Sequence, residues 1–178
     1  MVALVENHYV NAAAQEIHGV DLSIKKEFAL PAGSLDAFGS ASWLHIEQQL
    51  LPTSPAQTLT GTLFNPPTAR VRSGLTWVYG GFSSTGVLNW VAGETDNDVT
   101  PSVAVGDWTT VDMVLTYRFG RLTPQLPGLE STLAITNLFD RAPPFARGAA
   151  VELPGVYFDS TNASAIGRFV SLKLRQRF

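Results

Sequence analysis

The sequence predicts an all-β protein, namely an antiparallel, up-and-down transmembrane β-barrel segment of about seven strands with long extracellular loops. Three observations lead to this class. Apolar and polar residues alternate with a period of two in seven segments, clusters of Gly, Pro, Asn, Asp and Ser separate the segments, and the separating stretches are alternately short and long. The chain also lacks a run of about 18 apolar residues, which excludes a transmembrane helix.

The expected strands span residues 19–28, 38–48, 71–79, 82–92, 110–119, 131–139 and 166–178. Alternation is clearest in the fifth and the last, and their apolar members are expected to face lipid: Val111, Met113, Leu115, Val170, Leu172 and Leu174. The first and third strands alternate in the same way. The pattern in 38–48, 82–92 and 131–139 leaves both choices of outward face open.

Short connections are expected at residues 31–37, 80–81 and 121–130, and long ones at 51–69, 93–107 and 140–165. Outer-membrane barrels have short periplasmic turns and long extracellular loops, so this alternation places the C-terminus in the periplasm. Bacterial single-chain barrels use even strand numbers, and lipid cannot satisfy the open edges of a sheet. Seven strands therefore predict an incomplete barrel.

Aromatic residues are expected to form girdles at both membrane interfaces. The short-turn end would carry Phe28, Phe38, Tyr79, Phe82, Tyr117, Phe119 and Phe178, and the long-loop end Trp43, Trp90, Trp108 and Phe139. The girdle assignment itself rests on six of these, Phe28, Tyr79, Tyr117, Phe119, Trp90 and Trp108.

Residues 137–140 read Asn-Leu-Phe-Asp, a Tyr-Phe-Asp follows at 157–159, and Gly-Arg at 167–168 leads into a strand that ends in Phe178. In this order they resemble the closing strands of TonB-dependent receptors, and residues 107–112 and 11–22 are similar to strand openings common in that family. The resemblance covers nearly the whole chain. Its motif positions are Asn137, Leu138, Phe139, Asp140, Tyr157, Asp159, Gly167 and Arg168.

The resemblance implies a 22-stranded, plugged barrel in the bacterial outer membrane that takes up a scarce solute with energy from TonB. Siderophore, cobalamin, haem and oligosaccharide receptors share these closing strands. The implied partners are outer-membrane lipid, the remainder of the barrel, the plug domain, the TonB complex through an upstream region, and the barrel-assembly machinery. That machinery would recognise Val170, Leu172, Leu174 and Phe178 by strand addition.

Residues 1–178 would then be the C-terminal part of the barrel domain, without a plug or a TonB-contacting segment and unable to transport alone. The first seven residues carry neither the basic nor the apolar region of a secretory signal, so a signal peptide is expected upstream.

Several polar groups were candidates for ligand binding. His8, His18 and His45 lack the close spacing of a metal site and are expected to face solvent or the lumen. The set Glu94, Asp96, Asn97 and Asp98 offers calcium-type oxygens, but its Gly-flanked loop favours a solvated turn. The lumen-facing cations Lys173, Arg175, Arg177 and Arg118 are expected to contact the plug in preference to an anionic solute.

Other function classes fit poorly. A net charge of -3 argues against nucleic-acid binding, the chain has no cysteine, and catalytic motifs are missing, so neither an enzyme nor a cofactor or metal protein is expected. Two alternatives stay open. One is a soluble β-barrel or sandwich that binds a ligand and buries Val111, Met113 and Leu115 in a dry interior; the other is a complete porin-like barrel with an eighth strand from residues 1–10.

Overall fold

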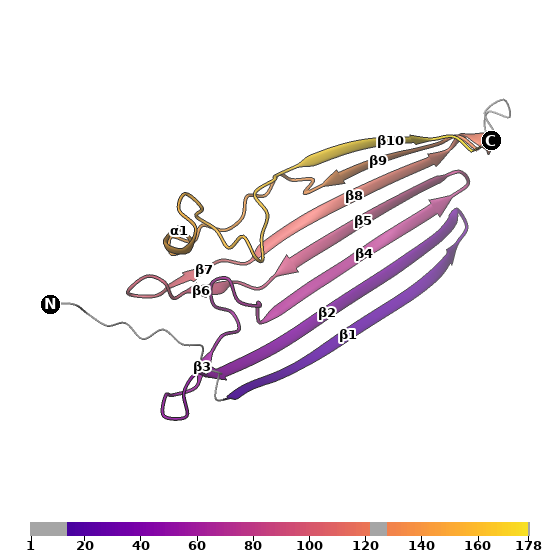
Figure 1. Ribbon diagram of the computed structural model, residues 1–178. Coiled ribbons are helices and arrows are strands. Elements are labelled where there is room, and N and C mark those ends of the chain that lie inside the picture. The colour runs from indigo at the N-terminus through magenta and orange to yellow at the C-terminus, as the bar shows by residue number, and fades with distance from the viewer. Residues whose placement is uncertain (1–13, 122–127, 178) are drawn as a thin grey trace.

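The computed structural model describes residues 14–121 and 128–177, which form one broad antiparallel sheet with loops gathered at one end (Figure 1). The long strands are β1 (Ala14–Leu30), β2 (Gly33–Gln49), β4 (Ala69–Tyr79), β5 (Phe82–Val91), β8 (Trp108–Arg118), β9 (Glu130–Thr136) and β10 (Phe169–Arg175). Each pairs with the next in this order, so β1 and β10 are open edges. The predicted up-and-down, unclosed sheet is confirmed.

The short connections lie together at one end of the sheet (Figure 1). Pro31 and Ala32 form the first, and Gly33 follows with a φ of 95°; a Cβ there would lie 1.9 Å from the carbonyl oxygen of Val78, so only glycine fits. The expected turn at 31–37 was too long, because residues 34–37 already pair with both β1 and β4. Residues 80–81 form the second turn, as predicted.

The third connection at this end begins with a 3₁₀ turn (Phe119–Arg121), and the amide of Phe119 donates to the carbonyl of Leu129 at 2.9 Å. The three long connections, residues 50–68, 92–107 and 137–168, lie at the opposite end (Figure 1). They contain β3 (Gln57–Thr58), which pairs with β2, the hairpin β6 (Glu94–Asp96) and β7 (Val103–Val105), and helix α1 (Ala149–Glu152). The predicted alternation of short and long connections is confirmed.

The register divides the sheet into an apolar and a polar face, because residues directly opposite on paired strands share a face. Met113 is paired with Ile135, which is paired with Val170, and Leu115, Leu133 and Leu172 form the next row. The predicted lipid-facing residues therefore share one face. The same pairing assigns the strands that the sequence left open: Trp43, Leu88 and Leu133 lie on that apolar face.

The apolar face is not covered by other parts of the described chain. Leu22, Ile24 and Leu172 are 67%, 69% and 67% exposed. Val111, Met113 and Leu115 are only partly buried, so the dry interior required by the soluble alternative is wrong for the described residues. The eighth strand of the porin-like alternative would lie outside the described residues. None of the described helices is long and apolar enough to cross a membrane.

Two aromatic predictions are wrong. Phe38 is paired with Lys25 and Gly74 and therefore lies on the polar face. Its ring occupies the space beside Gly74, where an added Cβ would lie 2.6 Å from the ring. Trp108 is paired with Val91 on the polar face, whereas its predicted girdle neighbour Trp90 lies on the apolar one. In both cases the pairing with the neighbouring strands decides the face on which the aromatic ring lies, and the sequence does not show that pairing.

Candidate functional site

The apolar face carries a cluster of aromatic rings near the short turns. Phe28, Tyr79, Phe82 and Tyr117 lie on this face, and Phe119 packs edge-on against Tyr117 with the ring centroids 4.8 Å apart. The sequence prediction missed Trp77, which stacks on Tyr79 and donates from its indole nitrogen to the carbonyl of Ala32 at 2.9 Å. The signal that could have identified Trp77 was its apolar-face position, next to Tyr79, in the alternating segment 71–79. Phe178 lies outside the described residues.

At the loop end of the same face, Trp43 and Trp90 mark the second aromatic level. The indole nitrogen of Trp90 donates to Asp107 at 3.0 Å, and Trp43 stacks on His45 with the ring centroids 6.4 Å apart. Phe139 is 72% exposed in the loop that follows β9. Both tryptophans thus have an apolar body on the face and a polar contact or stacked ring toward the loops, the arrangement typical of an interface.

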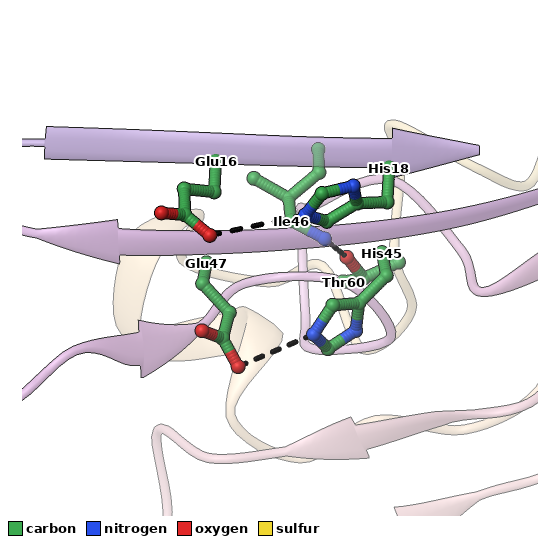
Figure 2. A network of polar contacts seen from close by, with 6 residues as sticks. All are labelled: Glu16, His18, His45, Ile46, Glu47 and Thr60. Carbon is green, nitrogen blue, oxygen red and sulfur yellow. Dashed lines mark hydrogen bonds and ion pairs between the residues drawn. The ribbon is translucent and has the colours of Figure 1, made fainter.

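Figure 2 shows a group of polar side chains on β1 and β2. His18 of β1 lies directly opposite His45 of β2, and Glu16 lies opposite Glu47. Each histidine contacts the glutamate of its own strand, at 3.8 Å in β1 and 3.2 Å in β2. His18 is exposed and His45 is half-buried, and both lie on the apolar face, so the predicted alternative of a position on the opposite, polar face is wrong. His8 lies outside the described residues.

Figure 2 also shows how the first long loop is fixed to the sheet. Ile46 of β2 donates from its backbone to the buried hydroxyl of Thr60 (Figure 2). The backbone amide of Leu59 donates to the carbonyl of Ile46 at 2.9 Å. Residues 59–60 of this loop therefore lie beside β2 and are hydrogen-bonded to it, and β4 begins later, at Ala69.

The polar face carries its charges at two levels. Near the short turns, Arg118 pairs with Glu130 at 3.0 Å, and Glu130 is directly opposite Arg175. Near the loops, Arg70 and Arg72 of β4 lie on the same face, with Ser42 and Ser40 opposite them on β2. Ser23 of β1 completes the second row. The sequence prediction considered the cations near the turns as candidate contacts and did not consider Arg70 or Arg72 in that role, although it placed Arg72 on the polar side of its strand.

A hollow of about 380 Å³ lies over these rows of the polar face, lined among others by Ser23, Ser40, Ser42, Arg70 and Arg72. Its size falls within the ~300–1,000 Å³ of small-molecule sites. A neighbouring hollow of about 550 Å³ also includes Arg72, together with Trp108 and Phe169. Trp108, which the sequence assigned to the girdle, therefore lines a hollow on the polar face. Its indole nitrogen is buried and has no hydrogen-bond partner within the described chain.

The three long loops meet in one small apolar cluster. Leu63 comes from the first loop, Val105 from β7 in the second, and Ala146 and Ala149 from the third; all four are buried, and Phe64 packs against them. This cluster holds most of the buried apolar residues of the described chain. The loops are therefore a packed unit, in contrast to the open sheet below them.

Asp159 is the hydrogen-bond centre of this unit. Its carboxylate accepts bonds from the backbone amides of Phe64, Thr161 and Asn162, at 3.0, 2.7 and 3.1 Å, and from the Asn162 side chain at 2.7 Å. The Asn162 amide also donates to the carbonyl of Asn65. One buried residue of the predicted family motif thus joins the first and third loops, because a buried carboxylate must satisfy its acceptor sites.

The second loop is attached through its own carboxylates. Asp96 is 1% exposed and accepts a bond from the amide of Gly148 at 2.6 Å, so this part of the acidic stretch is not the solvated turn predicted from the sequence. Burial raises the pKa of Glu94 from 4.5 to about 8, with further contributions from its hydrogen bond to Asp159 and from the charges of Asp159 and Asp96. At neutral pH Glu94 is mainly protonated and donates to Asp159.

The Asn-Leu-Phe-Asp motif ends β9 and positions β10. Asn137 is buried with a φ of 51°, and its side-chain amide exchanges hydrogen bonds with the backbone of Arg141 at 2.9 and 3.0 Å. The backbone amide of Asn137 donates to the carboxylate of Asp112 at 2.9 Å. Asp140 accepts a bond from the amide of Arg168 at 2.7 Å, and a Cβ on Gly167 would lie 2.8 Å from that carboxylate. These motif residues have a structural role, as does Tyr157, which stacks on Phe145.

In the part of the chain that the structure describes, no group of three or more His, Asp or Glu side chains has the arrangement of a metal site. The candidate site is instead the loop end of the polar face together with the loop cluster above it. Arg70 connects the two, because its guanidinium contacts the side-chain oxygen of Asn162.

Comparison with protein-family models finds a match over residues 3–138 to the family described as TonB dependent receptor-like, beta-barrel. The match covers most of the chain and ends at Leu138, so six of the motif positions lie beyond it, namely Phe139, Asp140, Tyr157, Asp159, Gly167 and Arg168. Comparison with curated proteins finds no match. With the open antiparallel sheet, its two faces and its packed loops, this match shows that the chain belongs to the family of TonB-dependent receptor β-barrels.

Proposed function

We propose that this chain supplies part of the barrel wall and three extracellular loops of a bacterial outer-membrane receptor that imports a scarce solute with energy from TonB. The observation that carries the proposal is the convergence of all three long loops on Asp159 above the polar face. Loops fixed to a rigid scaffold are where recognition residues are concentrated. A siderophore, cobalamin, haem or an oligosaccharide is the class of solute that family membership suggests.

In this proposal the apolar face contacts lipid and the polar face lines the lumen. The large exposed apolar side chains, such as Leu22 and Leu172, support the assignment, because a soluble protein rarely leaves such a face open. The free edges of β1 and β10 would pair with the remaining barrel strands, since lipid cannot satisfy backbone groups. The short turns and the C-terminus would then be periplasmic, near the plug and the barrel-assembly machinery.

Whole-cell uptake tests the function. Cells that produce the full-length receptor are supplied with labelled ferric siderophores, cobalamin, haem and oligosaccharides, with matched strains that lack the receptor or TonB. We expect one solute class to accumulate only when both are present. Accumulation that continues without TonB would contradict active transport.

Loop excision then assigns the function to this chain. Val91 and Trp108 are a directly paired residue couple, so a two-residue turn can replace residues 92–107 without breaking the β5–β8 register. We expect reduced uptake by an assembled barrel, as judged by heat-modifiable migration in gels. Replacement of Pro31 and Ala32 by Asn-Gly is the matched control at the opposite end. Unchanged uptake after excision of each of the three loops would contradict the assignment.

A further inference from the structure

Two arginines dominate the charge of the polar face directly below the loops. Arg70 and Arg72 are two residues apart on β4 and therefore project from the same face. Both are exposed. Arg70 lies near the start of β4, next to the long loop that precedes it, so the pair is located at the end of the lumen from which an external solute would arrive.

Neither arginine is neutralised by a carboxylate within the described residues. Arg70 contacts the amide oxygen of Asn162, and Arg72 contacts the amide oxygen of Asn89. The three ion pairs of the described chain involve other residues. Amide oxygens are neutral acceptors, so these contacts bring no negative charge to balance either guanidinium group.

Three acidic residues lie around the pair, and none of them forms an ion pair with either arginine. Asp159 accepts a hydrogen bond from Asn162, the partner of Arg70. Asp21 lines the same hollow but lies two strands from Arg70 in the same row, with Ser42 between them, which corresponds to about 10 Å between backbones. Asp112 is separated from Arg72 by Asn89, whose amide nitrogen donates to Asp112 at 2.9 Å. Lys25, one row further from the loops on β1, adds a third positive charge.

The surroundings of the pair suit a small anion. Ser23, Ser40 and Ser42 leave the face open beside the arginines and place hydroxyl donors along the hollow of about 380 Å³. A carboxylate, phosphate or phenolate oxygen would be a stronger acceptor for either guanidinium than the present amide oxygens, because charge-assisted hydrogen bonds are roughly twice as strong as neutral ones.

We propose that Arg70 and Arg72 form an anion-binding site on the lumen wall and that the imported solute is an oxygen-rich anion. This inference rests on the proposed function and adds the charge class of the solute. Replacing the neutral partner of Arg70 by a ligand oxygen would also release Asn162, so binding at the wall is connected to the loop that contains Asp159.

The test uses the purified full-length receptor in detergent and measures binding of citrate by isothermal titration calorimetry. Triethyl citrate, which has the same skeleton without charge, is the matched probe. We expect citrate to bind, triethyl citrate not to bind, and added salt to weaken the interaction. The double variant Arg70→Gln with Arg72→Gln should bind citrate at least tenfold more weakly, and the lysine double variant should retain much of the affinity.

Arg118→Gln is the control, because Arg118 lies on the same face at the turn end and is paired with Glu130. Heat-modifiable migration establishes that each variant forms a barrel. The proposal is overturned if citrate fails to bind the wild-type receptor, or if the glutamine double variant binds it as well as the wild type does. TonB-dependent uptake of a neutral solute together with either result would retain the proposed function and reject the anionic class. Citrate binding without TonB-dependent uptake would retain the anion-binding site and reject the proposed function.

Discussion

Glu94 makes the stability of the loop cluster depend on pH. Its pKa is raised from 4.5 to about 8 by burial, by its hydrogen bond to Asp159, and by the charges of Asp159 and Asp96. The folded loops therefore hold a proton that the unfolded chain releases between these two pH values. The stabilisation is complete below about pH 4.5 and is lost as pH rises through about 8.

The size of the effect follows from the shift. A change from 4.5 to about 8 corresponds to at most about 5 kcal/mol of differential interaction at about 1.4 kcal/mol per pH unit. Because Glu94 is partly exposed and screened by solvent, we expect about 1–2 kcal/mol. This corresponds to roughly a five- to thirtyfold increase in the open population of the loops between pH 5 and pH 9.

Hydrogen exchange measured by mass spectrometry on the full-length receptor tests this expectation. Peptides that cover β6, β7 and Asp159 are followed at pH 5 and pH 9, and wild type is compared with Glu94→Gln at each pH so that intrinsic exchange rates cancel. The glutamine side chain can still donate to Asp159, so the variant should remain protected at pH 9. Glu47→Gln, an exposed change on β2, is the control. If wild type and Glu94→Gln showed the same pH dependence, this account of Glu94 would be refuted.

Two further predictions concern the faces of the sheet. Gly74→Ala should lower the thermal midpoint of barrel unfolding, because the added Cβ would lie 2.6 Å from both the ring of Phe38 and the carbonyl oxygen of Gly86. Overpacking of this kind costs about 1–3 kcal/mol. The control variant Gly86→Ala should be nearly neutral, because a Cβ at Gly86 meets no atom within 4 Å. Equal midpoints for the two variants would contradict the packing of Phe38. Leu172→Arg should destabilise the barrel in lipid by about 2–4 kcal/mol in urea-unfolding titrations, whereas Ser171→Arg on the polar face should not. If Ser171→Arg were the more destabilising variant, the polar face and not the apolar face would be the one that contacts lipid.

Sequence periodicity predicted the strands well, because one face of each strand must be apolar along its whole length. In β8 and β10 the alternation was regular, and Met113 and Leu172 were assigned to the correct shared face. In β5 it was interrupted, because Ser84 and Gly86 occupy apolar-face positions. Small residues are compatible with either face, so only pairing to β4 and β8 reveals the side on which Leu88 and Trp90 lie.

The loop cluster was less predictable because its contacts join residues that are distant in sequence. Asp159 was selected only as a motif residue, and its bond to the amide of Phe64 spans 95 positions. The acidic stretch around Asp96 has the composition of a solvated turn, and no local signal indicates that Gly148 will cover it. Arg70 and Arg72 were overlooked for a related reason: a lumen-facing arginine is ordinary in a barrel, and only the missing carboxylate partners distinguish this pair.

The contacts around Asn162 imply that wall and loops respond together. The Asn162 side chain accepts a contact from Arg70 of the sheet and donates to Asp159. Asp159 in turn accepts hydrogen bonds from the amide of Phe64 in the first loop and from Glu94 in the second. A change in the contacts of Arg70 at one end of this series of hydrogen bonds, or of Glu94 at the other, therefore alters the hydrogen-bond partners available at the opposite end. Because the sheet has fixed register while the loops share a small core of four buried residues, the loops are the part that can rearrange at lower cost. A ligand that draws Arg70 away from Asn162 would thus act on the loops and not on the barrel wall.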